Sequence, residues 1–134
     1  MDEIDETEQQ REAAMEIIAK AGAAKSCAFA AIHRAKTFDF VGAAEQLDEA
    51  ERYATEAHKV HTDLLVREAG GQQTDAGLLM THAQDHFMMA TLAQEMADVV
   101  TITLNDYEAG REVGLRIGQT HHQAVCLLGV SETD

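Results

Sequence analysis

Not one of the 134 residues in this chain is proline, and tryptophan is absent as well. Proline interrupts helices and favours turns, while β-sheets are rich in aromatic and β-branched residues. The chain has only four phenylalanines and two tyrosines, whereas alanine, the strongest helix former, recurs throughout. Because a chain of this length normally forms one domain, the sequence predicts a single all-α domain.

Apolar residues recur at spacings of three and four along three segments, which is the pattern of one helix face. The first predicted helix covers residues 7–36 and the second covers 40–69, where Gly70-Gly71-Gln72-Gln73 ends it because glycine favours the left-handed conformation. The third begins near Leu78, and its periodicity weakens after Tyr107. We therefore expect a helical domain over residues 1–109.

Each predicted helix carries one narrow stripe of this kind. Alanine-rich stripes let helices approach closely but bury little area per residue, so strict heptads along helices of roughly 45 Å indicate that several subunits share a larger bundle. The third stripe contains a histidine and a carboxylate, which need polar partners if they are buried. The stripes are Ala21, Ala24, Ala28, Ala31 and Ala35; Phe40, Ala43, Leu47, Ala50, Ala54, Ala57, His61 and Leu64; and Leu78, His82, Asp85, Met89, Leu92, Met96, Val99 and Thr103.

The two ends of the chain differ from this helical region. Seven acidic side chains against one arginine in residues 2–16 predict that roughly the first 12 residues are disordered. Four glycines interrupt residues 110–134, which we treat as a C-terminal tail whose order and role the sequence leaves open.

Charge and composition exclude several classes of function. With 24 acidic against 10 basic residues, the formal net charge of -14 repels phosphate backbones and anionic lipids, so we expect neither a nucleic-acid partner nor direct membrane insertion. No uncharged run approaches the roughly 18–20 apolar residues of a membrane span, and the first residues are too acidic for a signal peptide. Together with two widely spaced cysteines, Cys27 and Cys126, this indicates a cytoplasmic protein.

The richest cluster of chemical groups is His82-Ala83-Gln84-Asp85-His86 in the third helix. Residues three and four apart share a helix face, so His82, Asp85 and His86 point to one neighbourhood. Three interpretations fit: a metal site, a histidine nucleophile that becomes a phosphohistidine, or buried polar groups that only fix helix register. The spacing alone leaves all three open, as it leaves open the role of His61 on the second stripe.

Several motifs, in their order and spacing, resemble the IIA components of the lactose/cellobiose class of the bacterial sugar phosphotransferase system, which includes those for N,N'-diacetylchitobiose. The resemblance covers roughly residues 12–107. It rests on Ala21-Gly22-Ala23-Ala24-Lys25-Ser26, Phe38-Asp39-Phe40, Glu56-Ala57-His58 with Thr62, Glu68-Ala69-Gly70, and His82-Ala83-Gln84-Asp85-His86-Phe87-Met88.

The resemblance implies a phosphoryl carrier, a transferase component of that system. Each subunit would be an antiparallel three-helix bundle, and three would form a homotrimeric nine-helix bundle. His82 would accept phosphate from the histidine-containing phosphocarrier protein HPr and pass it to a cysteine of the IIB component. A β-linked disaccharide entering through the IIC permease would then be phosphorylated, although the sequence does not indicate which one. The alternative is a non-catalytic oligomeric scaffold or adaptor whose histidines are structural.

The same resemblance assigns roles to the neighbours of His82. Gln84 and His86 would orient and support it, and Asp85, shared at the trimer axis, would hold a divalent metal, with Mg²⁺ expected. Three residues are expected to form a partner surface, namely Phe87, Met88 and Met89.

Three positions depart from the family pattern. Lys25 stands where arginine is common, Phe38 where glycine precedes Asp-Phe, and His61 where glutamine precedes threonine. We expect the first two to be tolerated, while His61 puts a titratable group in the middle of the bundle.

Overall fold

In the computed structural model the chain is described over residues 2–73 and 77–127, with side chains for residues 6–73, 77–112, 115 and 116. Three α-helices follow one another: α1 (Asp2–Lys36), α2 (Phe40–Ala69) and α3 (Leu78–Leu127). No strand occurs in the described ranges, so the prediction of an all-α fold is confirmed.

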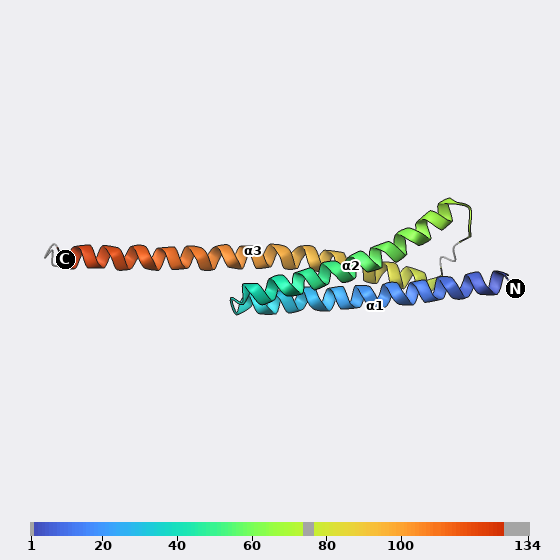
Figure 1. The fold of residues 1–134 in the computed structure, drawn as a ribbon, viewed down its shortest axis with the longest axis horizontal. Coiled ribbons are helices and arrows are strands. Elements are labelled where there is room, and N and C mark those ends of the chain that lie inside the picture. Colours follow the sequence, from blue (N-terminus) through green and yellow to red (C-terminus); the bar gives the residue numbers. More distant parts are fainter. Residues whose placement is uncertain (1, 74–76, 128–134) are drawn as a thin grey trace.

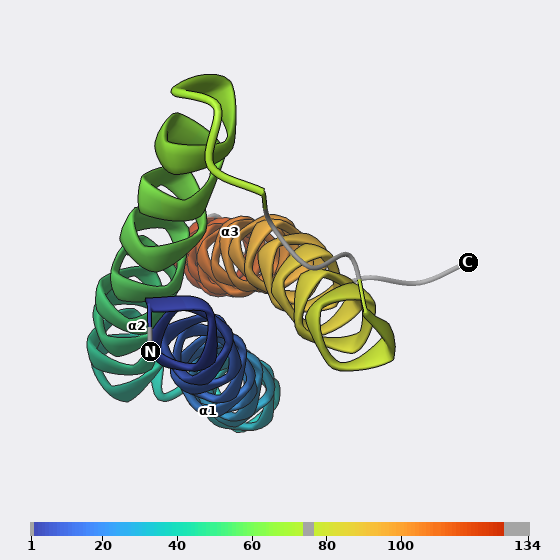
Figure 2. The ribbon, with the colours of Figure 1, turned by 90° about the vertical axis from the view of Figure 1, so that its right-hand side faces the viewer.

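The three helices form an up-down-up bundle (Figure 1). Helix α1 packs against both α2 and α3, whereas α2 and α3 contact each other far less. Figures 1 and 2 show the C-terminal end of α2 leaning away from α1, and the C-terminal part of α3 continuing beyond the ends of the other two helices. The bundle therefore exposes one side of α3 along most of its length.

Alanine fills the contact between α1 and α2. The whole predicted stripe of α1 is buried, and the α2 stripe is buried or half-buried, which confirms both as inward faces. Ile17 is the largest side chain that is fully buried among the described residues. Small side chains let the helices approach closely, so this seam depends on close backbone packing rather than on large apolar groups. We call it the alanine seam: Ala21, Ala24, Ala28, Ala31 and Ala35 of α1 with Ala43, Ala50 and Ala57 of α2.

The turn between α1 and α2 holds Phe38 in the left-handed conformation, with φ at 60°. The backbone N–H of Phe38 donates to the Ala35 carbonyl, and that of Asp39 donates to the Arg34 carbonyl, which is the Schellman ending of a helix. Glycine is usual at this left-handed position because a Cβ atom costs roughly 1–2 kcal/mol there. Phe38 is therefore strained, at a position where glycine would be relaxed.

Asp39 is the N-cap residue of α2, directly before the first helical residue, Phe40. Its carboxylate accepts a hydrogen bond from the backbone N–H of Gly42 at 3.0 Å and an ion-paired hydrogen bond from Arg34 at 2.9 Å. These two contacts hold the pKa of Asp39 below its usual value. A Cβ atom at Gly42 would lie 2.2 Å from Asp39 Oδ2, so the cap requires glycine at that position.

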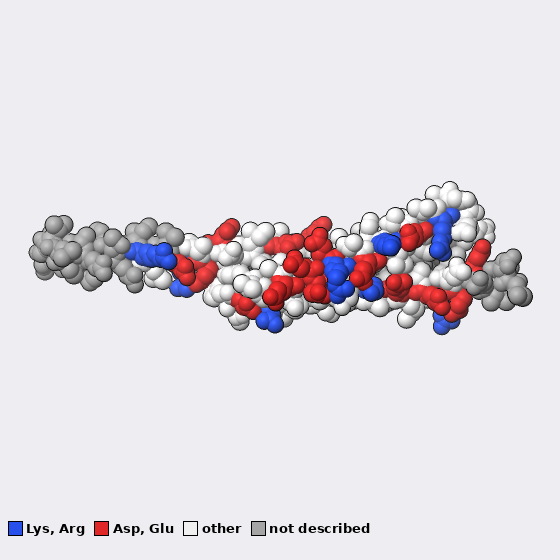
Figure 3. Space-filling model, viewed as in Figure 1, with Lys and Arg blue, Asp and Glu red and all other residues white. Residues whose placement is uncertain are grey.

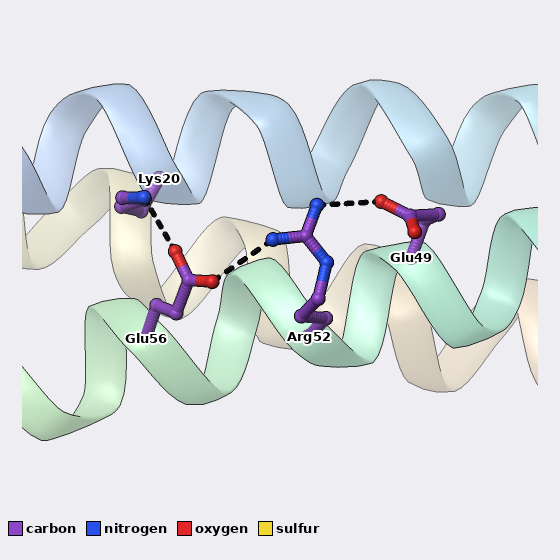
Figure 4. A network of polar contacts seen from close by, with 4 residues as sticks. All are labelled: Lys20, Glu49, Arg52 and Glu56. Atoms are coloured by element: carbon purple, nitrogen blue, oxygen red, sulfur yellow. Dashed lines mark hydrogen bonds and ion pairs between the residues drawn. The ribbon is translucent and has the colours of Figure 1, made fainter.

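A chain of charged side chains links α1 to α2 on the outside of the seam (Figure 4). On α2, Arg52 pairs with Glu49 and with Glu56 at 2.6 and 2.9 Å, and Glu56 also pairs with Lys20 of α1. The Lys20 contact lowers the pKa of Glu56, and Glu56 in turn raises the pKa of Lys20. Because these groups are exposed, the network orients two helices more than it stabilises them.

Both chain ends are more helical than the sequence predicted. Helix α1 begins at Asp2 rather than near residue 7, and this differs from a disordered start of roughly 12 residues. Acidic residues at a helix N-terminus interact favourably with the helix dipole, and Glu, Gln, Arg and Ala are good helix formers. Helix α3 continues through Gly110 to Leu127, so much of the expected C-terminal tail is helix.

The heptad predicted as the third stripe is not the buried face of α3 within the chain. The face toward α1 lies one position further, where Ala83, Ala90 and Ala97 are almost fully buried. The apolar residues of the stripe are more than half exposed. We call this surface the α3 stripe: Asp85, Met89, Leu92, Met96 and Val99.

By length and mean hydropathy alone, Leu78–Glu112 of α3 could cross a membrane. This segment does not meet the stricter criterion applied to the sequence above, an apolar run without charged residues. The helix carries Glu95 and Asp98 in its middle, and its other face packs on α1. An amphipathic bundle helix passes the same test, so this feature reflects the α3 stripe and not a helix that is apolar all round.

Candidate functional site

Two histidines contact each other on the exposed side of α3. The Nε2 atoms of His82 and His86 lie 3.1 Å apart, and their rings meet edge to face with centroids 4.5 Å apart. His82 is exposed and His86 is half-buried. The predicted sharing of one face is thus confirmed for this pair, and one imidazole must donate a proton to the other.

The start of α3 fixes the position of His82. The backbone N–H and the hydroxyl of Thr81 both donate to the carbonyl of Gly77, which closes the first helical turn directly before His82. The adjoining Ala83 is fully buried against Ala14, Ile17 and Leu64. His82 therefore projects from a firmly packed helix, while its ring remains accessible.

Gln84 and Asp85 are exposed, and neither forms a hydrogen bond with the two histidines within the described ranges. Gln84 lines a groove between α2 and α3 together with His61, Leu64 and Met80. Asp85 is not among the residues that line that groove and belongs to the α3 stripe. The structure therefore separates these two residues, although they are adjacent in the sequence.

Phe87 occupies a position that the sequence analysis did not anticipate. Its ring stacks on His61 at 5.4 Å and on His58 at 5.7 Å between centroids, with interplanar angles of 19° and 26°. His61 thus contacts Phe87, and no bond or ring contact joins it to His82 in the described part of the chain. The signal was present in the sequence, since His58 and His61 are spaced to share a face of α2.

The three residues of the expected partner surface fall into different environments. Phe87 is half-buried between the helices, while Met88 is 64% and Met89 is 53% exposed. Met89 belongs to the α3 stripe, whereas Met88 lies beside it. Phe87 also lines a second groove between α2 and α3, together with Glu51, His58 and Glu95.

Within the described residues, no cluster of three or more His, Cys, Asp or Glu side chains could hold a metal ion. A single chain offers one exposed carboxylate, Asp85, on the α3 stripe. Carboxylate oxygens are the hard ligands that Mg²⁺ prefers, so Asp85 fits the expected metal only if several copies share it.

The chemistry available here is that of an accessible imidazole with a second imidazole in hydrogen-bond contact. A neutral imidazole nitrogen is a good nucleophile, and its neighbour can fix which nitrogen carries the proton. Neither bonds nor ring contacts of the histidine pair involve Lys or Arg in the described residues.

Fold and site together define a small helical protein that presents an accessible histidine pair. Residues 12–104 match the family model described as "PTS system, Lactose/Cellobiose specific IIA subunit". The chain belongs to this family. Its members are phosphoryl carriers of the sugar phosphotransferase system, and this chain is such a phosphotransferase component, which disfavours the scaffold alternative.

Curated relatives and solved structures agree with this assignment. The N,N'-diacetylchitobiose-specific EIIA component of Escherichia coli K12 is 38% identical over 91 residues, covering 68% of this chain and 78% of that protein. The cellobiose-specific EIIA component of Lactococcus lactis is 46% identical over 83 residues, covering 62% and 72%. The crystal structure of the cellobiose-specific enzyme IIA from Bacillus anthracis superposes with a TM-score of 0.71 at 33% identity, covering 73% of this chain and 90% of that one.

Proposed function

We propose that His82 is the residue that carries the phosphoryl group. The observation that supports this choice is its accessibility combined with the 3.1 Å contact to His86 Nε2. His58 is also exposed, and His61 is half-buried, but both rings stack on Phe87. Among the histidines whose side chains the structure describes, only the pair on α3 combines an open approach with an imidazole partner.

In the proposed step, a lone pair on a ring nitrogen of His82 attacks phosphorus in the phosphohistidine of the donor. The new N–P bond forms as the donor's N–P bond breaks, and the donor nitrogen keeps the electron pair. In the next step, an acceptor thiolate attacks the phosphorus atom on His82. The S–P bond forms as the His82 N–P bond breaks, and the His82 nitrogen keeps the electron pair. No water takes part, so the carrier must favour transfer over hydrolysis.

His86 and Gln84 are positioning residues in this proposal. If His86 donates its Nε2 proton to His82 Nε2, the His82 ring is held in the Nδ1–H tautomer with its lone pair on Nε2, and this hydrogen bond breaks when that lone pair attacks phosphorus. Once phosphate occupies His82, the same proton is available to a phosphoryl oxygen. Gln84 lies in the groove beside His61, where an amide suits contact with an incoming partner.

The proposed partners are HPr as donor and a IIB component as acceptor, with a IIC permease taking the sugar. Phe87 and Met88 directly follow the histidine pair on α3 and offer apolar side chains to a partner, and methionine adapts to more than one partner. The relatives are named for N,N'-diacetylchitobiose and cellobiose, so we infer a β-linked disaccharide as the sugar served. The two phosphoryl transfers through His82 take place in the cytoplasm in this proposal.

We also propose a homotrimer whose copies pair through the α3 stripe. The stripe has the heptad spacing of a coiled-coil seam and is exposed in the single chain. Three copies of Asp85 would meet at the axis, where like charges repel unless a cation bridges them. Mg²⁺ held by Asp85 of each copy would supply that positive charge. Met89 then contacts other copies and not HPr.

Phosphorylation by phosphoenolpyruvate, enzyme I and HPr, followed by intact mass at alkaline pH, tests this proposal. We expect one phosphoryl group per chain, no label in His82→Ala, and an unchanged helical circular dichroism spectrum. His86→Ala should label slowly but completely, with rescue of the rate by His86→Gln. Label that persists in His82→Ala, or that disappears on His61→Gln, would contradict the assignment.

A further inference from the structure

The part of α3 beyond the family match is the feature that the proposed function does not explain. The match ends at residue 104, but α3 continues as one helix to Leu127. Figure 1 shows this part extending past the ends of α1 and α2. The described side chains from Ile102 onward are exposed, apart from the half-buried Leu104 and Glu108.

A lone helix of this composition is not stable in water. Gly110, Gly114 and Gly118 each cost roughly 1 kcal/mol relative to alanine, and short isolated helices are marginal even without glycine. The ion pair between the exposed Arg111 and the half-buried Glu108 contributes only about a few tenths of a kcal/mol. Helix in this segment therefore requires packing against something outside the single chain.

The heptad register of the α3 stripe continues without interruption into this segment. Alternate steps of three and four from Val99 pass through Thr103, Asp106 and Gly110, and then reach apolar positions again. These later positions are Val113, Ile117, Ala124 and Leu127, with Thr120 between them. Because the heptad register is the same on both sides of a short polar stretch, we expect the same partner to cover the α3 stripe and the segment beyond it.

We propose that residues 110–127 of α3 form a parallel coiled coil with the same segment of other copies of this chain. The inference rests on the proposed trimer, in which parallel α3 helices meet along the α3 stripe and their ends emerge at the same side. Self-association satisfies the register because each copy brings the identical heptad at the same height. The charged residues Arg111, Glu112 and Arg116 lie off the seam positions, as a solvated coiled-coil surface requires.

Disulfide mapping tests the arrangement in the full-length chain. In a Cys27→Ser, Cys126→Ser background, a single cysteine at Ile117 should form covalent dimers under mild oxidation, with about a third of the chains left unpaired since each thiol pairs once. Leu115, which is exposed but off the seam, is the matched control and should cross-link several-fold less. Met96→Cys reports on the trimer within the bundle.

The three variants separate the two proposals. Cross-linking at Met96 but not at Ile117 would overturn the coiled coil and leave the trimer intact. Cross-linking at none, together with a monomeric sedimentation coefficient, would overturn the trimer and this inference with it. Equal cross-linking at Ile117 and Leu115 would indicate random collision and would also overturn the coiled coil.

Hydrogen exchange provides a second test that does not depend on disulfide geometry. The backbone amides of residues 110–127 should be protected in the unmodified protein. Ile117→Asp should accelerate their exchange roughly tenfold or more, whereas Leu115→Asp should leave it unchanged. Fast exchange in the unmodified protein, or equal effects of the two substitutions, would refute the packed segment.

Discussion

The alanine seam and the α3 stripe have the same heptad spacing but opposite environments. Ala28 and Ala50, on the seam, are completely buried within one chain, whereas Leu92 and Met96, on the stripe, are 58% and 56% exposed. Periodicity shows which residues share a helix face, but it does not show what covers that face. The difference teaches that the chain's own fold and its proposed assembly use separate surfaces.

Residue size also distinguishes the two regions. The seam is built from methyl groups, which suit helices in close contact, while the stripe presents methionine, leucine and valine. On α3 itself, Ala83, Ala90 and Ala97 face α1, and the larger residues face outward. Acidic side chains predominate on the face of the bundle seen in Figure 3. The larger apolar residues of the α3 stripe thus lie on the surface that we propose other copies cover.

The largest effect on the stability of the chain is expected from placing a larger side chain in the alanine seam. Ala50→Leu adds volume at a site with no exposed area, so it should lower the free energy of unfolding by roughly 1–3 kcal/mol. Thermal and urea unfolding followed by circular dichroism measure the change. Ala44→Leu, on the exposed side of α2, is the control and should be nearly neutral. Equal effects would mean that the seam is not tightly packed.

A charge on the α3 stripe should disrupt the assembly of the copies and leave the fold of the single chain intact. Leu92→Asp places three carboxylates near the proposed axis, which should dissociate the trimer while α1 and α2 stay helical. Sedimentation velocity and circular dichroism distinguish the two effects, and Asp98→Asn, an exposed substitution off the stripe, is the control. A trimer that survives Leu92→Asp would show that another surface holds the copies together.

Asp85 sharpens the same comparison. Asp85→Leu removes the charge and adds apolar area to the stripe, so the trimer should become insensitive to EDTA. The unmodified protein should lose trimer when metal is stripped at alkaline pH, as seen by sedimentation velocity. A wild-type trimer that is equally stable with and without EDTA would mean that no cation is shared at Asp85.

Relief of strain at the turn should give a smaller gain. Phe38→Gly removes the Cβ atom from a residue with φ at 60°, so we expect a stabilisation of about 1 kcal/mol after the entropy cost of glycine. Thermal unfolding measures it. Phe38→Ala keeps the Cβ atom and also loses the ring contact with Phe40, so it should not stabilise the chain. If Phe38→Ala also stabilised the chain, removal of the exposed ring, and not relief of backbone strain, would be the cause.

The smallest expected effect is a change in stability at acidic pH that depends on Asp39. The pKa of Asp39 is lowered by the Gly42 N–H and by Arg34, so its contribution is present above the unfolded pKa of about 4 and is lost as pH falls through the lower folded value. Asp39→Asn keeps a capping oxygen but does not ionise. The stability difference between the two proteins should therefore shrink below pH 4, as measured by unfolding at a series of pH values, and a constant difference would disprove the linkage.

Much of the fold could be predicted because it depends on local properties. Helix α2 was predicted with its observed bounds, since the glycines after Ala69 act on neighbouring backbone groups, and Gly71, with φ at 90°, is the left-handed one. The N-terminal end of α1 and the C-terminal end of α3 were not predicted, because acidic and glycine-rich segments have weak periodicity. At the site, spacing on one helix predicted the His82–His86 contact, whereas the stacking of Phe87 on His58 and His61 depends on how α2 and α3 face each other.

The sequence by itself determined the all-α class, the faces of α1 and α2, and the pairing of His82 with His86, because each follows from the rise and turn of a single helix. Only the tertiary structure decided which face of α3 is buried. Both faces of that helix have helical periodicity, and the alanine face wins inside the chain because small side chains let α3 approach α1 closely. The larger residues of the α3 stripe are left exposed for that reason.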